Sequence, residues 1–401
     1  MTAIVTLTDK GAARVRGGLP WVYAADLARP HDGDDDVVEL RDRRGATLGT
    51  GLWSPRSPVP VRILAREPVT LDRALLSARL AAALARRAAD GYEPAARSGG
   101  ESAARLVHGE ADALPGLFVD RYADVVVLQT TAPAMDRREA LVAELLAELT
   151  AARLVVARDD GSARDFEALP RRAEVLRGGG STVVRYRDAG SLVEVDVLRD
   201  GKTGGFLDQV ANHDEARRVA RGDCLDAFTY HGGFALALCR GGARSVLAID
   251  ESAAAIGRAA ENAARNGYAQ LRAEVGNAFD RLRALEAEGR RFDVVVVDPP
   301  ALAKRRRTGA GPAAAAAALR AYRELNHRAL RLLAPGGVLV SCSCSGRVGV
   351  ADFGAMLDAA ARDAGRAVQL LARRGAGPDH PVLLGVPETE YLKCFVLRVL
   401  A

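Results

Sequence analysis

The amino-acid sequence predicts an α/β protein with a β-rich N-terminal module, an α+β middle domain and a C-terminal Rossmann-like, doubly wound sheet. Its 401 residues exceed what one ordinary hydrophobic core needs, so several domains are expected. Short strand-like runs broken by Gly, Pro and Asp fill the first part of the chain. From about Leu192 onward, apolar runs alternate with helical stretches, a pattern typical of a parallel sheet covered by helices.

Charge and hydropathy exclude a membrane span but do not by themselves indicate a partner. No run approaches the roughly 20 apolar residues that a spanning helix needs, so the sequence predicts a cytoplasmic protein with no membrane partner. The net charge of +5 suits a polyanionic partner, but a composition rich in Ala and Arg accounts for it equally well. Only four lysines occur, and Lys202, Lys304 and Lys393 lie beside the motifs described below.

The cysteines indicate reduced thiols. They form neither a plausible disulfide framework nor a paired CxxC zinc site, so no metal is expected. The five are Cys224, Cys239, Cys342, Cys344 and Cys394.

Residues 1–75 are expected to form the β-rich module. The predicted strands are Val37 to Leu40, Thr47 to Leu52 and Val59 to Leu64, separated by turn-forming residues. An Ala/Leu/Arg helix is predicted over Leu71 to Ala89, followed by a Gly- and Pro-bearing joint at Gly91 to Glu101. The first domain boundary therefore falls near this helix.

Residues 76–190 are expected to form the α+β middle domain. One amphipathic helix is predicted over Ala134 to Leu149. The predicted strands around it are Leu117 to Asp120, Val125 to Thr130, Leu154 to Ala157 and Thr182 to Tyr186.

Residues 191–401 are expected to form the doubly wound sheet. Glu390 to Val399 would add a late strand, and the alanine run at Ala313 to Ala318 is predicted to begin a helix. Ligands of such sheets bind outside the carboxyl ends of the strands, so functional residues should gather there. The predicted strands are Cys224 to Ala227, Ser245 to Ile249, Phe292 to Val297 and Val338 to Ser341.

Residues able to bind a nucleoside follow the first two of these strands. Gly232 and Gly233 open a helix and would let backbone approach a ligand, although the loop is not a GxGxxG fingerprint. Asp250 ends the next strand, where a carboxylate can accept hydrogen bonds from a ribose diol. Alone, Asp250 could equally be a solvated acid and Ser252 a helix N-cap.

Two further strand ends carry candidate residues. Asn277 and Phe279 offer an amide and a ring to an adenine, although on these residues alone an ordinary loop with a buried Phe is slightly favoured. Asp298 is followed by Pro299 and Pro300, which force an extended, rigid turn and fix the position of the acid.

The last strand end carries two thiols. Ser341-Cys342-Ser343-Cys344-Ser345 follows an apolar run, and three hydroxyls beside two thiols make poor core material. On these residues alone, packing of small side chains and thiol chemistry are about equally favoured. Because successive strand residues alternate between faces, Cys342 and Cys344 are expected to point the same way.

The order of these motifs resembles a class I S-adenosylmethionine-dependent methyltransferase. Several segments resemble one family in particular, the bacterial large-subunit (23S) ribosomal RNA cytosine-5 methyltransferases with an N-terminal PUA domain. They are KTGGFLDQ (Lys202 to Gln209), FTYHGGFA (Phe228 to Ala235), the Asp-Pro-Pro turn, SCSG (Ser343 to Gly346), HPV (His380 to Val382), YLKCF (Tyr391 to Phe395), LPWVY (Leu19 to Tyr23) and HGEADALPGLFVDRY (His108 to Tyr122).

The resemblance implies S-adenosylmethionine as cofactor. His231 stands where the family more often has Thr, and Asn277 where an acid is common. The residues implied to hold the cofactor are Lys202, Gln209, Phe228, Thr229, Tyr230, Gly232, Gly233, Asp250, Glu251, Asn277, Phe279, Asp298 and Pro299.

The resemblance also implies a covalent mechanism that forms 5-methylcytidine. Cys344 aligns with the nucleophile, Cys342 is the second candidate, and Asp298 would hydrogen-bond the cytosine edge. No cysteine follows Pro300, so a single-cysteine mechanism is expected. Ala301 stands where enzymes that methylate exocyclic amines commonly carry an aromatic residue, which weakens the case for that reaction. Methylation of guanine N7 and a non-catalytic role as an RNA-binding assembly factor also stay open.

Large-subunit ribosomal RNA is the implied partner. Predicted RNA contacts are Arg14, Arg16 and Trp21 in the N-terminal module, and the basic run Lys304, Arg305, Arg306 and Arg307. A solvated charged loop is the simpler interpretation of that run. The sequence leaves open the target nucleotide, the choice between naked RNA and a subunit precursor, and the oligomeric state, a homodimer included.

Overall fold

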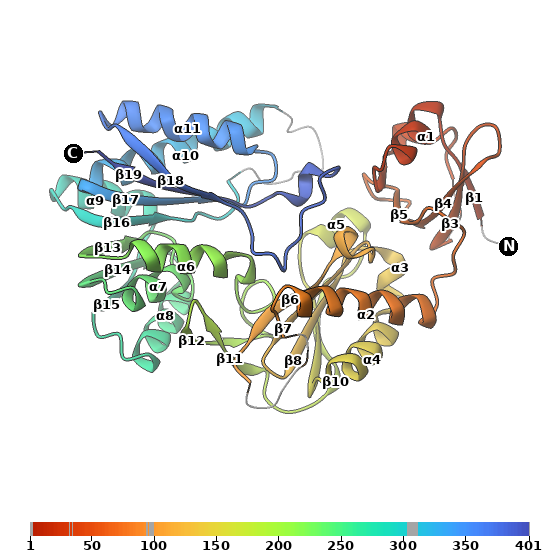
Figure 1. Cartoon of the computed structure of the whole chain (residues 1–401), viewed down its shortest axis with the longest axis horizontal. Coiled ribbons are helices and arrows are strands. Elements are labelled where there is room, and N and C mark those ends of the chain that lie inside the picture. Colours follow the sequence, from red (N-terminus) through yellow and green to blue (C-terminus); the bar gives the residue numbers. More distant parts are fainter. Residues whose placement is uncertain are drawn as a thin grey trace. The chain divides into compact units, whose positions relative to one another are not determined.

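The computed structural model describes residues 3–31, 33, 35–93, 95, 100–302 and 312–400 (Figure 1). Two compact units divide the chain. The first comprises Met1–Tyr186, Val195–Gly205 and Pro378–Pro387, and the second comprises Arg187–Glu194, Phe206–Gly377 and Glu388–Ala401. The first two predicted domains therefore lie in one unit, which also takes two short segments from later in the chain. Within the described ranges, no helix combines the length and apolar character needed to cross a membrane.

The N-terminal part of the first unit is a five-stranded sheet with the order β1-β3-β4-β5-β2. Gly49 has a φ of +133°, and a Cβ there would lie 2.2 Å from the Ala65 carbonyl oxygen, so β4 and β5 approach closely only with glycine. The predicted third strand begins two residues late, at Val61, because Pro60 has no N–H to donate. The elements are β1 (Ala3–Thr6), α1 (Asp9–Arg16), β2 (Trp21–Val22), η1 (Ala24–Asp26), β3 (Val37–Arg41), β4 (Thr47–Trp53) and β5 (Val61–Ala65).

The middle part of the first unit is a second five-stranded sheet, ordered β10-β9-β8-β7-β6. Helices α2 and α4 pack on it through a buried aliphatic core. The predicted helix over Ala134 to Leu149 is divided in two, since α3 ends before Arg137 and α4 starts at Glu139. The elements are α2 (Arg73–Ala89), β6 (Ala103–His108), η2 (Gly109–Asp112), β7 (Leu117–Tyr122), β8 (Val125–Thr130), α3 (Pro133–Asp136), α4 (Glu139–Thr150), β9 (Leu154–Asp159), α5 (Ala163–Glu167), β10 (Arg172–Gly178) and the paired strands β11 (Val183–Asp188) and β12 (Ser191–Asp196).

The second unit is a seven-stranded sheet with the order β15-β14-β13-β16-β17-β19-β18. Strands β13 to β17 are parallel, and β19 is antiparallel to both β17 and β18. Strand order reverses between β13 and β16, which is the switch point where doubly wound sheets bind ligands. The elements are η3 (Leu207–Gln209), α6 (Val210–Val219), β13 (Asp223–Asp226), α7 (Gly233–Arg240), β14 (Ser245–Asp250), α8 (Ala253–Arg265), β15 (Leu271–Val275), α9 (Ala278–Ala287), β16 (Phe292–Val297), α10 (Pro312–Leu332), β17 (Leu333–Ser343), α11 (Val350–Asp363), β18 (Val368–Arg374), η4 (Pro387–Thr389) and β19 (Lys393–Val399).

Side-chain alternation along the central strands builds two cores, one on each face of this sheet. Leu225 and Val295 face the core formed with α9, α10 and α11. Their neighbours Cys224 and Val294 face the other core, formed with α6 and α7. Because both faces are covered, the central strands are apolar at nearly every position, as in Phe292–Val297 (Figure 1). The predicted bounds of β16 are confirmed, and α10 does include the alanine run.

Candidate active site

The predicted cofactor residues of the second unit lie at the carboxyl ends of β13, β14 and β16 and at the start of α9, except for Gln209, which lies in η3. After β13 the chain turns through Tyr230, with φ +48°, and Gly232, with φ +94°. Both values lie in the left-handed region, which is costly for Tyr230 and easy for Gly232. Asp226, fully buried at the end of β13, accepts a 3.0 Å hydrogen bond from the Ala235 amide in the first turn of α7. Burial raises the pKa of Asp226 to about 6.

Gly233, the first residue of α7, provides space for a neighbouring side chain. A Cβ at this position would lie 2.4 Å from Cε1 of His213, so the glycine makes room for a buried imidazole. His213 Nδ1 lies 2.7 Å from a carboxylate oxygen of Asp188. Although burial opposes the charged ring, Asp188 and other carboxylates raise the pKa of His213 overall. Close packing of α6 against α7 therefore favours glycine at position 233.

Asp250 connects two loops at the end of β14. One carboxylate oxygen accepts a 2.9 Å hydrogen bond from the Tyr230 amide, and the other accepts one of 2.9 Å from the Ser252 amide. Ser252 is the N-cap of α8, as one interpretation of the sequence anticipated. Each carboxylate oxygen retains a lone pair, so half-buried Asp250 can still accept from a diol. The neighbouring Glu251 is exposed.

His231 is a neutral side chain that packs against Tyr230. Its ring stacks on Tyr230 with centroids 3.7 Å apart and an interplanar angle of 12°. Burial lowers the pKa of His231 to about 4, and Arg258 acts in the same direction, so the ring is neutral at physiological pH. The departure from Thr at this position therefore adds an aromatic surface to the loop.

Asn277 is the N-cap of α9. Its side-chain oxygen accepts from the Phe279 amide at 3.0 Å and from the Asp280 amide at 3.4 Å. Only the amide nitrogen of its side chain is thereby left for an adenine edge. The Phe279 ring meets Phe228 edge to face, with centroids 6.5 Å apart. Both rings are half-buried, so the two predicted aromatic residues do share one surface.

Asp298 is held by a chain of amides. Gln209 Nε2 donates to Asp298 at 2.8 Å, and Asn212 Nδ2 donates to Gln209 Oε1 at 2.6 Å. Pro299 is buried behind the acid. The structure therefore brings together Gln209 and Asp298, two residues that the resemblance assigned to the cofactor. Lys202 is exposed and belongs to the first unit rather than the second.

The two thiols at the end of β17 differ in environment. Cys342 is fully buried, lies opposite Cys394 in the antiparallel ladder and packs in the α6/α7 core. Burial is the main cause that raises the pKa of Cys342 well above its ordinary value. Cys344 is half-buried. Because β17 ends at Ser343, strand alternation does not extend to Cys344, and the expectation that both thiols share a face loses its basis.

Two residues that the sequence analysis did not assign surround Cys344. The Tyr322 hydroxyl, from α10, accepts from Ser343 Oγ at 2.9 Å and lies 3.0 Å from Ser345 Oγ. Lys393 Nζ, from β19, donates to the carbonyls of Ser345 at 2.7 Å and Tyr391 at 2.8 Å. Lys393 is only 1% exposed. In the sequence, the scarcity of lysine was the one feature that could have drawn attention to Lys393 as a functional residue. No feature of the sequence singled out Tyr322.

Tyr391 connects this corner to the segment around Gln209. Its hydroxyl donates a 2.8 Å hydrogen bond to Asp208 in η3. The FLDQ part of one motif and the YLKCF motif, far apart in sequence, therefore meet within the second unit.

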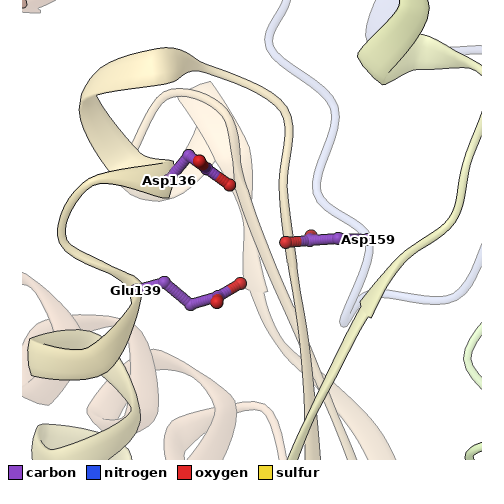
Figure 2. Close-up of side chains that lie close together, drawn as sticks. All are labelled: Asp136, Glu139 and Asp159. Carbon is purple, nitrogen blue, oxygen red and sulfur yellow. The ribbon is translucent and has the colours of Figure 1, made fainter. Parts of the chain in front are cut away.

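Figure 2 shows three acids of the first unit, Asp136, Glu139 and Asp159, whose carboxylates converge. Their oxygens lie within 4.8 Å of one another, a spacing that could hold a metal ion. Two arginines already neutralise the group: Arg164 contacts Asp136 at 2.8 Å and Asp159 at 3.0 Å, and Arg172 contacts Glu139 at 2.8 Å. Burial and Asp159 raise the pKa of Glu139. We interpret the cluster as an ion-pair network.

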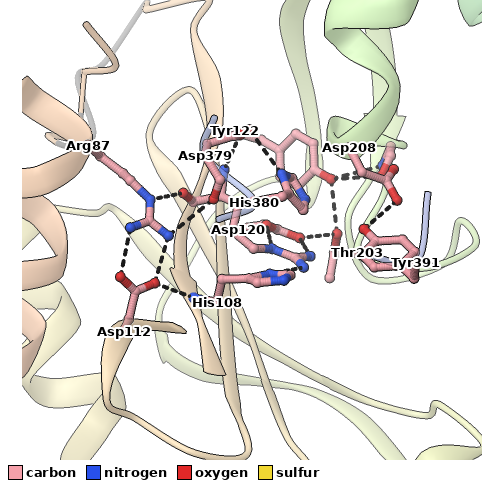
Figure 3. Close-up of polar contacts among 12 residues, drawn as sticks. Arg87, His108, Asp112, Asp120, Tyr122, Thr203, Asp208, Asp379, His380 and Tyr391 are labelled. Carbon is pink, nitrogen blue, oxygen red and sulfur yellow. Dashed lines mark hydrogen bonds and ion pairs between the residues drawn. The ribbon is translucent and has the colours of Figure 1, made fainter. Parts of the chain in front are cut away.

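A second network in the first unit centres on buried Arg87 (Figure 3). Its guanidinium donates to both carboxylate oxygens of Asp112, at 2.8 and 2.6 Å, and to the Asp379 carbonyl at 3.1 Å. The Asp379 side chain accepts from the Arg105 amide at 2.9 Å. Burial is the main cause that lowers the pKa of nearby His108 to about 3. This network attaches the Pro378–Pro387 segment to the unit.

Comparison with known proteins adds the family. A model described as S-adenosylmethionine-dependent methyltransferase matches residues 108–397, and a PUA-like domain model matches residues 5–66. The chain belongs to the S-adenosylmethionine-dependent methyltransferases. The predicted fold class and the predicted cofactor, S-adenosylmethionine, are thereby confirmed.

Curated relatives of this methyltransferase match along nearly its whole length. A ribosomal RNA large subunit methyltransferase from Deinococcus radiodurans is 36% identical over 96% of this chain and 94% of its own length. A ribosomal RNA large subunit methyltransferase I from Shewanella denitrificans is 34% identical over 95% of each chain. Among solved structures, a methyltransferase complexed with SAH has a TM-score of 0.84 at 17% identity, covering 99% of this chain and 100% of that chain.

The residues present suit the cofactor of this methyltransferase. Asp250 offers carboxylate lone pairs at the place where a ribose diol binds in doubly wound sheets. The half-buried rings of Phe228 and Phe279 provide an aromatic surface, and the Asn277 amide group provides a donor. When bound, S-adenosylmethionine supplies an electrophilic methyl group.

The predicted RNA-binding residues of the N-terminal part form ion pairs or hydrogen bonds within the protein. Arg14 contacts Asp26 at 3.0 Å, Arg16 pairs with Asp42, and the Trp21 indole donates to Glu110 at 2.8 Å. The side chains of Arg14 and Arg16 are still 42% and 54% exposed, so a phosphate could reach them. The run from Lys304 to Arg307 lies outside the described residues.

Proposed function

We propose that this methyltransferase forms 5-methylcytidine in large-subunit ribosomal RNA, in the cytoplasm, through a covalent adduct with Cys344. The names of the full-length relatives support the RNA class. A PUA-like domain at the N-terminus is consistent with a structured RNA substrate. Arg14, Arg16 and Trp21 in that domain are proposed to help position the RNA, together with the basic run after the Asp-Pro-Pro turn.

Half-buried Cys344, directly after the end of β17, carries the base assignment. Val297 and Ser341 are paired in the β16/β17 ladder, so Asp298 and the cysteine segment leave the sheet at the same edge. Cys344 combines access to a ligand with surrounding hydrogen bonds that hold its loop. Methylation of an exocyclic amine or of guanine N7 needs no thiol there. A nucleophilic cysteine therefore favours carbon 5 of cytosine.

The thiol is needed because carbon 5 of cytosine is too weak a nucleophile by itself. Addition of the Cys344 thiolate to carbon 6 gives carbon 5 enamine character, so that it can take a methyl group. Asp298 is proposed to hydrogen-bond the cytosine edge and to supply the proton that N3 gains during addition. A base then removes the carbon 5 proton, and the sulfur leaves carbon 6 with its bonding electrons. N3 returns its proton to Asp298, aromaticity is restored, and the thiolate is regenerated.

The cofactor site is proposed to consist of the loop from Phe228 to Gly232 with Asp250, Asn277, Phe279, Asp298 and Gln209. Gly233 and Glu251 have weaker support as cofactor residues, because Gly233 accommodates the His213 ring and Glu251 is exposed. Neither a metal ion nor a second cysteine is part of the proposed mechanism.

The test is methyl transfer from labelled cofactor to ribosomal RNA that lacks its modifications, followed by nucleoside analysis. Wild-type protein should produce 5-methylcytidine. Cys344→Ala should lower the rate by at least about 1,000-fold, because the nucleophile is lost. Cys342→Ala is the matched control, since Cys342 is fully buried and should be dispensable for chemistry.

Each contrary outcome removes a different part of the proposal. Full activity of Cys344→Ala would exclude it as nucleophile. 7-Methylguanosine or an N-methylated base in the product would identify a different reaction. Cofactor binding without methyl transfer to any ribosomal RNA would favour an RNA-binding assembly factor.

A further inference from the structure

We propose that Lys393 is a positioning residue that stabilises the Cys344 thiolate and holds its loop in place. The inference rests on the proposed role of Cys344 as nucleophile. Lys393 is the first residue of β19 and lies directly opposite Ser343 in the antiparallel ladder. Paired residues of antiparallel strands project to the same face, so the lysine side chain begins beside the residue that precedes Cys344.

The hydrogen bonds of Lys393 fix the chain immediately after the nucleophile. Its ammonium donates to the Ser345 carbonyl at 2.7 Å and to the Tyr391 carbonyl at 2.8 Å. An ammonium has three N–H donors, so these two carbonyls leave one for another acceptor. The Tyr322 hydroxyl also contacts Ser343 and Ser345, the two neighbours of Cys344. The loop that carries Cys344 is therefore held by hydrogen bonds from both α10 and β19.

The burial of Lys393 requires a reason. Lysine is almost never fully buried unless it is paired, yet Lys393 is 1% exposed and its hydrogen-bond acceptors are neutral carbonyls. Burial lowers the pKa of Lys393 to about 8, while negative charge on Cys344 and, to a smaller degree, on Glu390 acts in the opposite direction. Interaction between two sites is reciprocal, so a charged Lys393 lowers the pKa of the Cys344 thiol by the same interaction.

Arg347 is an exposed cation three positions after Cys344, and the remaining titratable groups around this corner do not supply a positive charge. Tyr322 of α10 is neutral, since burial raises the pKa of its hydroxyl. Glu390 and Asp298 are acids, and Cys342 is a buried thiol. Negative charge at these positions would disfavour a thiolate. Lys393 is the buried cation whose ammonium is hydrogen-bonded to the Cys344 loop.

The test measures the titration of Cys344 directly. The rate of iodoacetamide alkylation is followed from pH 6 to pH 10 in the full chain, and fragment-ion mass spectrometry of the peptide separates Cys344 from Cys342. In the wild-type protein, Cys344 should titrate below the pKa of about 8.5 of a free cysteine. A wild-type value at or above 8.5 would overturn the proposal without any variant.

Variants separate charge from structure. Lys393→Met keeps the aliphatic stem and should raise the Cys344 pKa by about one unit, which lowers the alkylation rate at neutral pH about tenfold. Lys393→Arg keeps the charge and should restore most of that rate. Lys10→Met is the control for net charge, since Lys10 is exposed on α1, and it should leave the titration unchanged. Thermal melting and cofactor binding report whether each variant folds.

The outcomes distinguish this inference from the proposed function. If a folded Lys393→Met protein titrates like wild type, Lys393 has only a structural role, even when Cys344→Ala is inactive in methyl transfer. If Cys344→Ala is fully active, the nucleophile assignment fails, while the titration still reports whether Lys393 acts on the thiol.

Discussion

At the scale of single residues, the environment of a side chain decides its role more than its identity does. The two cysteines of one short segment illustrate this, because Cys342 is sealed in a core while Cys344 is half-buried. The two glycines before α7 differ as well. Gly232 adopts a positive φ, whereas Gly233 makes room for the His213 ring. Asp226, directly before this loop, is an acid that burial keeps partly protonated near pH 6.

Asp226 should give the protein a measurable pH dependence. Its folded pKa of about 6 is raised above the ordinary 3.8, so its contribution to stability is fully present below about 3.8 and is lost as the pH rises through 6. Asp226→Asn removes this loss. The free energy of unfolding of the variant, relative to wild type, should therefore increase by up to about 3 kcal/mol between pH 4 and pH 7. Urea unfolding across this range is the measurement.

Asp223→Asn is the matched control on the same strand. The Arg244 guanidinium, followed by Ser245, lowers the pKa of the Asp223 carboxyl. Its contribution is therefore present above the ordinary pKa and is lost as the pH falls. Because pH 4 to 7 lies above this window, the stability of Asp223→Asn relative to wild type should stay nearly constant over that range. The same pH profile for both variants would contradict the assignment.

At the scale of secondary structure, the buried elements were predicted more accurately than the edges. Phe292–Val297 is apolar throughout because helices cover both of its faces. The edge strand β18 was not predicted, and β15 was indicated only by its end before Asn277, without bounds. Their residues are exposed or half-buried, and charged side chains interrupt their apolar pattern. Helix α9 begins directly after Asn277, which the sequence analysis assigned to the cofactor. In the structure, Asn277 is also the N-cap of this helix.

Asn277 should therefore affect stability and cofactor binding separately. Asn277→Ala removes the acceptor of two amide hydrogen bonds and should cost about 1 kcal/mol of stability, as N-cap losses do. Asn277→Asp keeps the acceptor and should remain within about 0.5 kcal/mol of wild type. Chemical unfolding measures both effects.

The same pair of variants tests the cofactor role. Asn277→Asp lacks the amide donor but keeps the cap. A weaker Kd for S-adenosylmethionine in this stable variant, measured by calorimetry, is expected if the amide contacts the adenine. Unchanged affinity in both variants would leave the residue with its capping role alone.

At the scale of the whole molecule, the chain does not divide into consecutive blocks. The segment Pro378–Pro387 lies between β18 and β19 in sequence but belongs to the first unit. Arg87 joins it there by donating to the Asp379 carbonyl while also pairing with Asp112 (Figure 3). The HPV motif is part of this segment, which gives it a structural role in the first unit.

Arg87→Ala should destabilise the first unit severely. The substitution removes the buried guanidinium that pairs with Asp112 and leaves a buried carboxylate without enough positive charge beside it. Such a loss typically costs about 3 to 5 kcal/mol of stability. Arg86 also contacts Asp112, but its side chain is 49% exposed, so Arg86→Ala should cost less than about 1 kcal/mol. Urea unfolding of the two variants is the measurement. Equal losses would show that burial does not decide the strength of this network.

The sequence by itself determined the class of the fold, the order of the strand ends and the family, because local patterns and adjacent residues encode them. Alternation of apolar runs with helices predicted the parallel sheet, and the motifs predicted S-adenosylmethionine. Only the tertiary structure decided which distant residues meet. Gly233 meets His213, Lys393 reaches the loop of Cys344, and Arg87 meets Asp379. These contacts depend on how the chain closes in space, and a burial-driven contact between distant positions leaves no periodic signal in a single sequence.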